Sequence, residues 1–355
     1  MVSPDRPTAA ELERRVADLV RQRFPTSWVT ALVEPTVPDV VVDVEAPDGS
    51  GARAVIQVKQ LVERRDVPRL VEEARNWSTR WGATPIIAAR YLAPSVRQAL
   101  SAAGVSYADA TGNMRIVMEK PAVFIVDRGE DRDPWRKGRP PGTLKGEPAA
   151  RVVRALLDYR RHWQARDLIA TAGASSGATY RVLDHLQREG LVVKSDARYS
   201  VTDWERLLRA WSAEVPLGAE TRVTAFIDPR GVDHFLVTLS RGWPFRFAVT
   251  GSVAAQEFAP YAPAKAAYVY VSSIEEAADP WGLRPNEAAP NVILLEPAPS
   301  DQLPFVRTVQ GKANYPVVAP SQLAADLLSG PGRAPAEGEF LIEWMTANED
   351  RWRRD

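Results

Sequence analysis

Hydrophobic and polar positions repeat along the chain with two different periods, and the period changes from segment to segment. Apolar residues recur at helical spacing over residues 11–24, with arginines on the other side of the stripe, which predicts an amphipathic helix. Two runs rich in valine, residues 40–47 and 52–61, flank the turn-forming residues 48–51. These runs predict a β-hairpin.

The remainder of the first 127 residues continues the alternation of helix and strand. Helices are predicted at residues 67–81 and 94–104, and strands at residues 85–91, 105–118 and 122–128. This order predicts an α/β domain over residues 1–127, with helices packed on a mixed sheet.

Three further segments follow. Residues 128–147 are rich in proline, glycine and charge, which is typical of a linker. Residues 148–212 form a compact helical pattern, and residues 213–355 return to strands before two final helices. The predicted fold class is therefore α+β and multidomain.

Composition narrows the function. The chain has 355 residues, of which 45% are hydrophobic and 25% charged, as in globular proteins. It has no cysteine, which excludes disulfides, iron–sulfur clusters and thiol catalysis, and only three histidines, which argues against a multi-histidine metal site. No apolar run reaches the roughly 20 residues of a membrane span, and no export signal begins the sequence. We expect a cytoplasmic protein with no membrane partner.

Charge is distributed unevenly. The whole chain is balanced, with 45 basic and 45 acidic residues, but residues 128–212 hold 17 Lys and Arg against 11 Asp and Glu. A basic middle between acidic ends favours one nucleic-acid-binding segment inside a larger frame.

The basic middle has the helix and strand order of a DNA-binding motif. Helices are predicted at residues 147–159, 164–173 and 174–190, followed by two short strands around residues 195–197. A short helix, a glycine turn, a longer helix and a hairpin resemble the winged helix-turn-helix of transcription factors. The resemblance implies double-stranded DNA as partner, with the third helix in the major groove.

The face of the third helix indicates which residues read DNA. Thr179, Val182, Leu183 and Leu186 form a buried stripe, with Ser175 or Ser176 as N-cap, so small residues and Arg181 point outward. The alternative is a protein-interaction module. The candidate DNA-binding residues are Arg160, Arg161, Arg166, Ser175, Ser176, Gly177, Thr179, Tyr180, Arg181, Arg188, Lys194 and Arg198.

The linker adds two candidates, Lys137 and Arg139. Residues 137–140 read Lys-Gly-Arg-Pro, which resembles the core of minor-groove hooks. A plain solvated linker is the preferred interpretation.

The first domain carries a possible metal site. Pro38-Asp39 and Asp43 lie on the first hairpin strand, and Gln57-Val58-Lys59 on the second. With a turn near residues 49–50, Asp43 would face Gln57. This pattern resembles the PD-(D/E)xK nucleases, which have a restriction-endonuclease-like fold, and implies Mg²⁺ held at Asp43, with Glu13 as an additional carboxylate.

Two features favour an inactive site. Gln57 stands where a carboxylate is usual, as also happens in Mrr-like members, and Asp39 and Asp43 compete for one role. The alternative is that Asp43 and Lys59 form a cross-strand ion pair. No cofactor is expected unless the nuclease is active, in which case Mg²⁺ is.

Two remaining stretches are distinctive. Residues 107–113 predict a turn held by the side chains of Asp109 and Asn113, a reading we favour over a binding role. Residues 247–345 resemble the C-terminal domain of AbiEi-family antitoxins, which is nucleotidyltransferase-like. The metal-binding acids of nucleotidyltransferases are missing from residues 267–271, so Gly251-Ser252 predicts a structural turn. No histidine has a triad partner at recognisable spacing.

These patterns lead to one main hypothesis. The chain is predicted to be a sequence-specific transcriptional regulator, a homodimer with a possible toxin or regulatory protein partner. The alternative is a Mg²⁺-dependent DNA endonuclease of phage defence, targeted by the winged helix. It is expected to use Glu13, Asp39, Asp43, Gln57 and Lys59.

Overall fold

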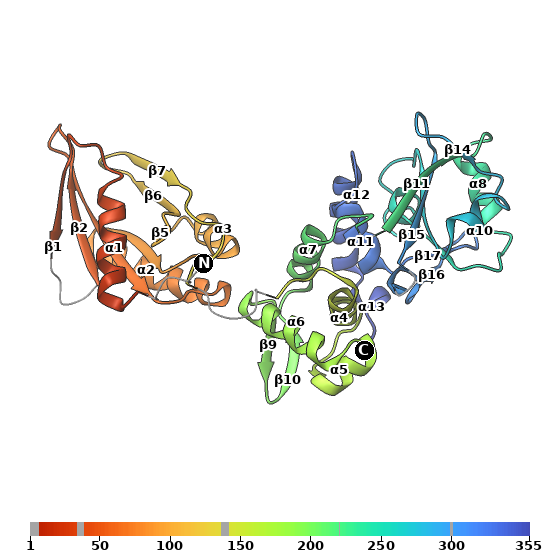
Figure 1. Ribbon diagram of the computed structural model, residues 1–355, viewed down its shortest axis with the longest axis horizontal. Coiled ribbons are helices and arrows are strands. Elements are labelled where there is room, and N and C mark those ends of the chain that lie inside the picture. The colour runs from red at the N-terminus through yellow and green to blue at the C-terminus, as the bar shows by residue number, and fades with distance from the viewer. Residues whose placement is uncertain (1–6, 34–38, 136–141, 220, 299–300) are drawn as a thin grey trace. The chain divides into compact units, whose positions relative to one another are not determined.

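The computed structural model of the chain describes residues 7–33, 39–135, 142–219, 221–298 and 301–355. They form two compact units, one built mainly from residues 1–140 and the other mainly from residues 141–355 (Figure 1). Among the described helices, none combines the length and the apolar character needed to cross a membrane.

The first unit contains a seven-stranded mixed sheet whose strands lie side by side in chain order. Strands β3, β4 and β5 are parallel, and the remaining neighbours are antiparallel. The strands are β1 (Val29–Val33), β2 (Val40–Glu45), β3 (Gly51–Lys59), β4 (Thr84–Ala89), β5 (Ser106–Asp109), β6 (Met114–Met118) and β7 (Val123–Asp127).

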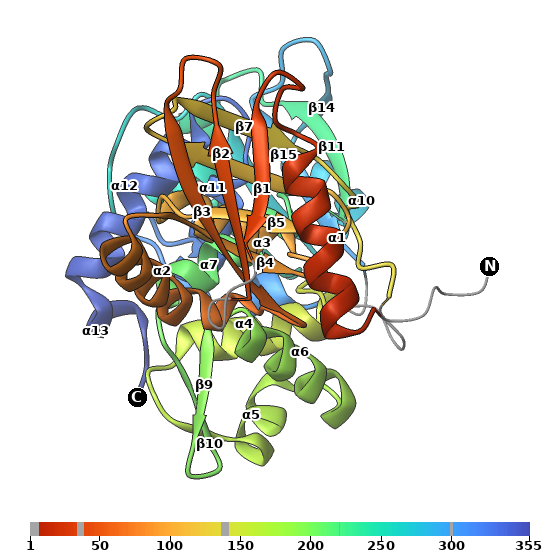
Figure 2. The same ribbon diagram turned by 90° about the vertical axis from the view of Figure 1, so that its left-hand side faces the viewer.

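Helices cover both faces of this sheet (Figure 2). Helix α1 (Ala9–Arg21) packs on the face that carries Val42 and Ile56, and α2 (Val67–Trp81) and α3 (Pro94–Ala102) serve the face that carries Val55 and Ile87. Successive strand residues point to opposite faces, so a run of valines supplies both cores. The short 3-10 helix η1 (Arg64–Asp66) precedes α2.

This architecture confirms the predicted helices on a mixed sheet, divides the predicted strand 105–118 into β5 and β6, and adds one further strand. Strand β1 was not predicted: its five residues stand between Pro25 and Pro35 and show too little alternation to stand out. It pairs antiparallel with β2 and forms the edge of the sheet.

The second unit begins with the helix and strand order of a winged helix. A three-stranded sheet in the order β8-β10-β9 accompanies the helices. The elements are α4 (Glu147–Asp158), β8 (Trp163–Gln164), α5 (Ala165–Ala172), α6 (Ser176–Arg188), β9 (Val192–Ser195), β10 (Arg198–Val201) and α7 (Trp204–Glu214). Gly173, with a φ of 61°, ends α5 in a left-handed cap, as its place in the sequence predicts.

The rest of the second unit is a seven-stranded mixed sheet in the order β14-β11-β15-β13-β12-β17-β16. Its strands are β11 (Thr221–Ile227), β12 (Phe247–Thr250), β13 (Ala267–Val271), β14 (Arg284–Pro285), β15 (Val292–Pro297), β16 (Val309–Gln310) and β17 (Pro316–Val317). Its helices are α8 (Val232–Leu239), α9 (Gly251–Ala255), α10 (Ile274–Ala278), η2 (Leu303–Phe305), α11 (Pro320–Leu328), α12 (Ala334–Ala347) and α13 (Glu349–Trp352).

The helices and hairpin of residues 147–214 and the following α/β portion share one hydrophobic core. Buried side chains form a continuous cluster from Leu144 to Trp352, and α11 packs against both α4 and α7. The predicted boundary near residue 212 therefore falls inside one compact unit. The reason is that α7 buries Leu207, Leu208 and Trp211 in the shared core.

A buried polar network reinforces this junction. On α4, Arg154 donates to Asp158 at 3.1 Å and to the Gln322 side chain of α11 at 3.0 Å. Arg307 reaches the same Asp158 at 3.0 Å, and the Ser321 hydroxyl donates to its other oxygen. Because buried charges without partners are costly, this pairing fixes α4 on α11.

Candidate nucleic-acid interface

Helix α6 begins at a side-chain cap. The hydroxyl of Ser175 accepts the N–H of Ala178 at 3.2 Å and so satisfies one of the free donors of the first turn. Ser175, rather than Ser176, is therefore the cap. The buried side of the helix agrees with the predicted stripe and consists of Ala178, Thr179, Val182, Leu183 and Leu186.

The opposite side of the N-terminal half of α6 is exposed. The residues concerned are Ser175, Ser176, Gly177, Tyr180 and Arg181. A Cβ built on Gly177 would meet no other atom within 4 Å, so the surface there is open. A narrow, open face with one guanidinium is what a base-reading helix requires.

Thr179 corrects one predicted contact. Its side chain is fully buried, and its hydroxyl donates to the Ser175 carbonyl at 3.1 Å. It belongs to the stripe that packs in the core and is not available to DNA.

The two strands β9 and β10 form the predicted wing. Asp196 and Ala197 both have positive φ, 48° and 62°, as a two-residue hairpin turn of type I′ requires. Lys194 and Arg198 are exposed on either side of the turn, and the ammonium of Lys194 lies 5.3 Å from the ring centroid of Tyr199. The hairpin, whose ribbon lies next to α6 in Figure 1, thus carries two exposed cations.

The three arginines expected near α5 differ in their surroundings. The Arg161 guanidinium lies 3.8 Å from the centroid of a Trp163 ring, which fixes its position. Arg166, which is largely exposed, is 3.3 Å from its neighbour Asp167. Arg160 is exposed and lies 3.8 Å from the carboxylate of Asp355.

Some of the remaining basic residues in this segment are already paired with carboxylates. Arg188 is the last residue of α6, and Lys137 and Arg139 lie outside the described residues. Arg154 is buried in the network with Asp158, and Arg209 is bound by Glu205 and Glu339. Arg154 is therefore interior and the charge of Arg209 is matched by two carboxylates, so the net charge of the segment overstates what is offered to a phosphate backbone.

The hairpin of the first unit has a different register from the one predicted. Asp43 pairs with Arg53, and the two side chains form an ion pair at 2.7 Å that lowers the pKa of Asp43. The expectation that Asp43 faces Gln57, and the alternative ion pair with Lys59, are both wrong. The cause is the turn: the Asp48 carboxylate accepts the Ser50 N–H at 2.9 Å and centres the turn earlier.

The corrected register brings Asp39 towards the second strand instead. Its carboxylate accepts the N–H of Val58 at 2.8 Å, between Gln57 and Lys59. The Gln57 amide donates to Glu73 on α2 at 3.1 Å, and its buried carbonyl oxygen has no hydrogen-bond partner among the described residues. The sequence did not indicate Glu73, because its contact with Gln57 depends on how α2 packs on the sheet.

Glu13 does not lie with the group formed by Asp39, Gln57 and Lys59. Glu13 is on α1, which packs against the sheet face opposite to that of α2. Within the part of the chain that the structure describes, no three His, Cys, Asp or Glu side chains are grouped as a metal ion would need.

The turn at residues 107–113 is held by a buried carboxylate, which confirms the structural reading. Asp109 is fully buried and accepts hydrogen bonds from the backbone N–H groups of Leu92, Thr111 and Asn113. The side chains of Thr111 and Asn113 donate to it as well. The carboxylate therefore joins β5 to the segment after β4.

Two groups of polar contacts in the second unit were not predicted from the spacing of residues in the sequence. The carboxylate of Asp228 lies 2.6 Å from the His234 ring, a pair that spacing alone did not reveal. On α11, Asp326 accepts from Thr250 at 2.6 Å and from Gln322 at 2.8 Å, beside Gly251, the predicted structural turn, whose φ is 66°.

Comparisons with models of protein families, with curated proteins and with solved structures returned no match.

Proposed function

We propose that this chain is a sequence-specific, double-stranded DNA-binding transcriptional regulator that reads DNA with α6. The observation that carries the proposal is the division of α6 into a buried stripe and an open face of Ser176, Gly177, Tyr180 and Arg181. The open face is narrow enough for the major groove, and Arg181 has the donor geometry to pair with a guanine edge.

The surrounding cations serve the phosphate backbone. These are Lys194 and Arg198 on the wing and Arg161 and Arg166 at α5, all of which are exposed. Phosphate contacts set position and much of the affinity, whereas base contacts set sequence preference.

Selection from fragmented genomic DNA, followed by a mobility-shift assay at physiological salt, tests this proposal. We expect enrichment of a short set of related duplexes, bound at least about a thousandfold more tightly than unrelated DNA. Equal affinity for every duplex would contradict sequence-specific regulation.

Two substitutions separate base reading from backbone binding. Arg181→Ala should weaken binding to the selected duplex by about 1–3 kcal/mol and relax the sequence preference at one or two base pairs. Lys194→Ala should weaken binding to all duplexes alike. It should also reduce the slope of log affinity against log salt concentration by about one. Fluorescence anisotropy against single-base variants of the duplex distinguishes the two results.

The proposal also includes the oligomeric state and the parts of the chain on either side of the DNA-reading segment. A homodimer would place two copies of α6 on two half-sites, so the selected duplexes should be palindromic. We assign the first unit to a nuclease-like fold with an inactive site and the region after residue 213 to an AbiEi-like fold with a dimer or protein partner. Light scattering with and without DNA tests the dimer.

A second candidate function is favoured by one observation at the hairpin. The unpartnered carbonyl oxygen of Gln57, the carboxylate of Asp39 and the ammonium of Lys59 belong to neighbouring strand ends, as in a PD-(D/E)xK nuclease. This candidate predicts nicking of plasmid DNA that depends on Mg²⁺ or Mn²⁺ and is lost in Lys59→Ala. No nicking with either metal would remove it.

A further inference from the structure

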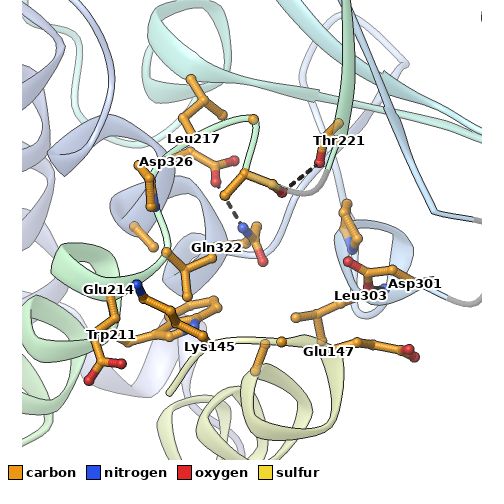
Figure 3. Close-up of a pocket in the computed structure, with 18 of the residues that line it drawn as sticks. Lys145, Glu147, Trp211, Glu214, Leu217, Thr221, Asp301, Leu303, Gln322 and Asp326 are labelled. Atoms are coloured by element: carbon orange, nitrogen blue, oxygen red, sulfur yellow. Dashed lines mark hydrogen bonds between the residues drawn. The ribbon is translucent and has the colours of Figure 1, made fainter. Parts of the chain in front are cut away.

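Strand β7 (Val123–Asp127) leaves one edge of the first unit's sheet open. It stands at the end of that sheet and pairs only with β6 among the described strands. The outward-pointing N–H and C=O groups of such a strand are a template for one more strand. In the pocket of the second unit drawn in Figure 3, by contrast, the carboxylates of Glu214, Asp301 and Asp326 already accept hydrogen bonds from the protein.

The side chains of β7 alternate between a covered face and an open face. Val123 and Ile125 pack against the core on the side of α1, whereas Phe124 is 72% exposed and Val126 is 57% exposed. The guanidinium of Arg115 on β6 lies 5.9 Å from the centroid of the Phe124 ring, yet most of the ring remains in solvent. Because two large apolar side chains share one face of an edge strand, a strand that covers them would be stabilised by the hydrophobic effect.

Strand β7 has few of the features that keep edge strands from pairing with other molecules. It contains no lysine or proline, and its pairing with β6 continues without a bulge. Its one charged residue, Asp127, is at its last position and is bound by Arg23 at 2.6 Å. Edge strands that stay single are usually protected by such features, so this edge favours pairing with another strand.

A second copy of β7 fits this edge. Antiparallel pairing centred on Ile125 places Phe124 of each copy opposite Val126 of the other, an aromatic and β-branched pair that forms twice. The two Asp127 carboxylates are then four positions apart, about 13 Å along the strands, whereas parallel pairing in register would set them side by side. A two-fold axis relates the strands, so the contact closes at two copies.

We propose that β7 pairs antiparallel with β7 of a second copy of this chain, which joins two seven-stranded sheets edge to edge. This inference rests on the homodimer of the proposed function and names one of its contacts, but it does not require DNA, since the first unit supplies every group that it uses. Because one strand edge buries little area, we expect a dissociation constant of this contact in the micromolar range.

Cysteine cross-linking of the full chain tests the register, because the chain has no cysteine of its own. In the proposed pair, Ile125→Cys places two thiols opposite each other, with Cα atoms about 4.5–5.5 Å apart, which is within the range of a disulfide. Val123→Cys is the matched control, because it lies on the same face of the same strand but about 13 Å from its symmetry mate. With oxidised glutathione, the covalent dimer on a non-reducing gel should form at least about tenfold faster in Ile125→Cys.

Charged substitutions test which edge of the sheet is used. In the Ile125→Cys chain, Phe124→Lys places an ammonium group beside the second strand, and it should slow cross-linking at least about tenfold. Leu32→Lys is the matched control, because Leu32 is an exposed apolar residue of β1, at the other edge of the same sheet, and it should leave the rate unchanged. Melting curves show whether both variants keep their fold.

Three outcomes would overturn the proposal. They are equal cross-linking of Ile125→Cys and Val123→Cys, a rate that Phe124→Lys leaves unchanged, and equal slowing by Leu32→Lys, which would indicate pairing of β7 with β1. If the same chains still select related duplexes, such a result removes this contact and leaves the DNA-binding proposal standing. Loss of duplex selection with cross-linking retained would do the reverse.

Discussion

Asp326 is a carboxylate whose ionisation is opposed by its surroundings. It is enclosed by α11, β12 and β13, and burial raises its pKa to about 6, although the hydrogen bonds from Thr250, Gln322 and Tyr270 and the charge of Arg154 act in the opposite direction. The same carboxylate and the burial of the ring raise the pKa of Tyr270 well above its usual range.

The pKa of Asp326 predicts a pH dependence of stability. An unfolded Asp has a pKa near 4, so the folded state binds this proton more tightly, and its contribution to the free energy of unfolding is largest below about pH 4. That contribution falls by about 3 kcal/mol as the pH rises through 6. Asp326→Asn should remove this pH dependence. In urea unfolding, the free energy of unfolding of the variant relative to the unchanged chain should therefore be higher at about pH 7.5 than at about pH 4.5. Parallel pH profiles would contradict the prediction.

Asp109 is a second buried carboxylate, and it accepts five hydrogen bonds. Asp109→Ala would leave five N–H and O–H donors without their acceptor, and we expect a loss of about 3 kcal/mol or more in the stability of the first unit. Asp131→Ala, an exposed acid of the following segment, should change stability by less than about 0.5 kcal/mol. Thermal unfolding followed by circular dichroism compares the two.

In the first unit, residue types indicated which polar positions matter, but they did not indicate which residues these positions contact. The sequence placed Asp39, Asp43 and Lys59 on a hairpin, which the structure confirms, but it paired them in the wrong register. Register depends on where the turn is centred, and the side chain of Asp48 shifts that point. The partner of Gln57, on α2, required knowledge of how a helix packs on the sheet.

At the level of elements, α6 and the hairpin that follows it show which features of the sequence are predictable. Its buried stripe, its Ser175 cap and the turn of the wing all follow from local spacing and turn-forming residues. Thr179 was assigned to both faces because it is polar, and helical geometry allows only the buried one. Local patterns therefore gave the element and its orientation but not every contact.

The open surface at Gly177 gives a test that separates folding from binding. Gly177→Glu adds a side chain into open space near the start of α6, where a negative charge is favourable, so stability should be equal or higher. Duplex binding should nevertheless fall by at least about 100-fold, because the carboxylate approaches phosphates and base edges. Gly177→Ala is the control, and anisotropy with melting curves provides both readouts. Unchanged binding in Gly177→Glu would place the DNA elsewhere.

At the scale of the whole molecule, the contacts between distant segments were least predictable. Helix α7 and its cover α11 are more than a hundred residues apart, and no local pattern in the sequence pairs the two. The polar link between Arg154 and Gln322 is equally invisible, because an arginine in a basic segment looks like a surface group. The division into two compact units follows from these contacts.

Truncation tests this division. Residues 142–355 should fold without the first unit and keep their affinity for the selected duplex, because their core is complete. Residues 142–215 should fail to give a dispersed amide spectrum, since Leu207, Leu208 and Trp211 would lose their cover. A well-folded short fragment would show that the shared core is dispensable.

The core shared by α4, α7 and α11 also limits how this protein can be re-engineered or rearranged in evolution. Recombination that transplanted only the three helices and the wing into another host would carry an uncovered apolar side and an orphaned Arg154. A working graft must transfer the α/β portion as well, so the portable module is about three times the length of an ordinary winged helix.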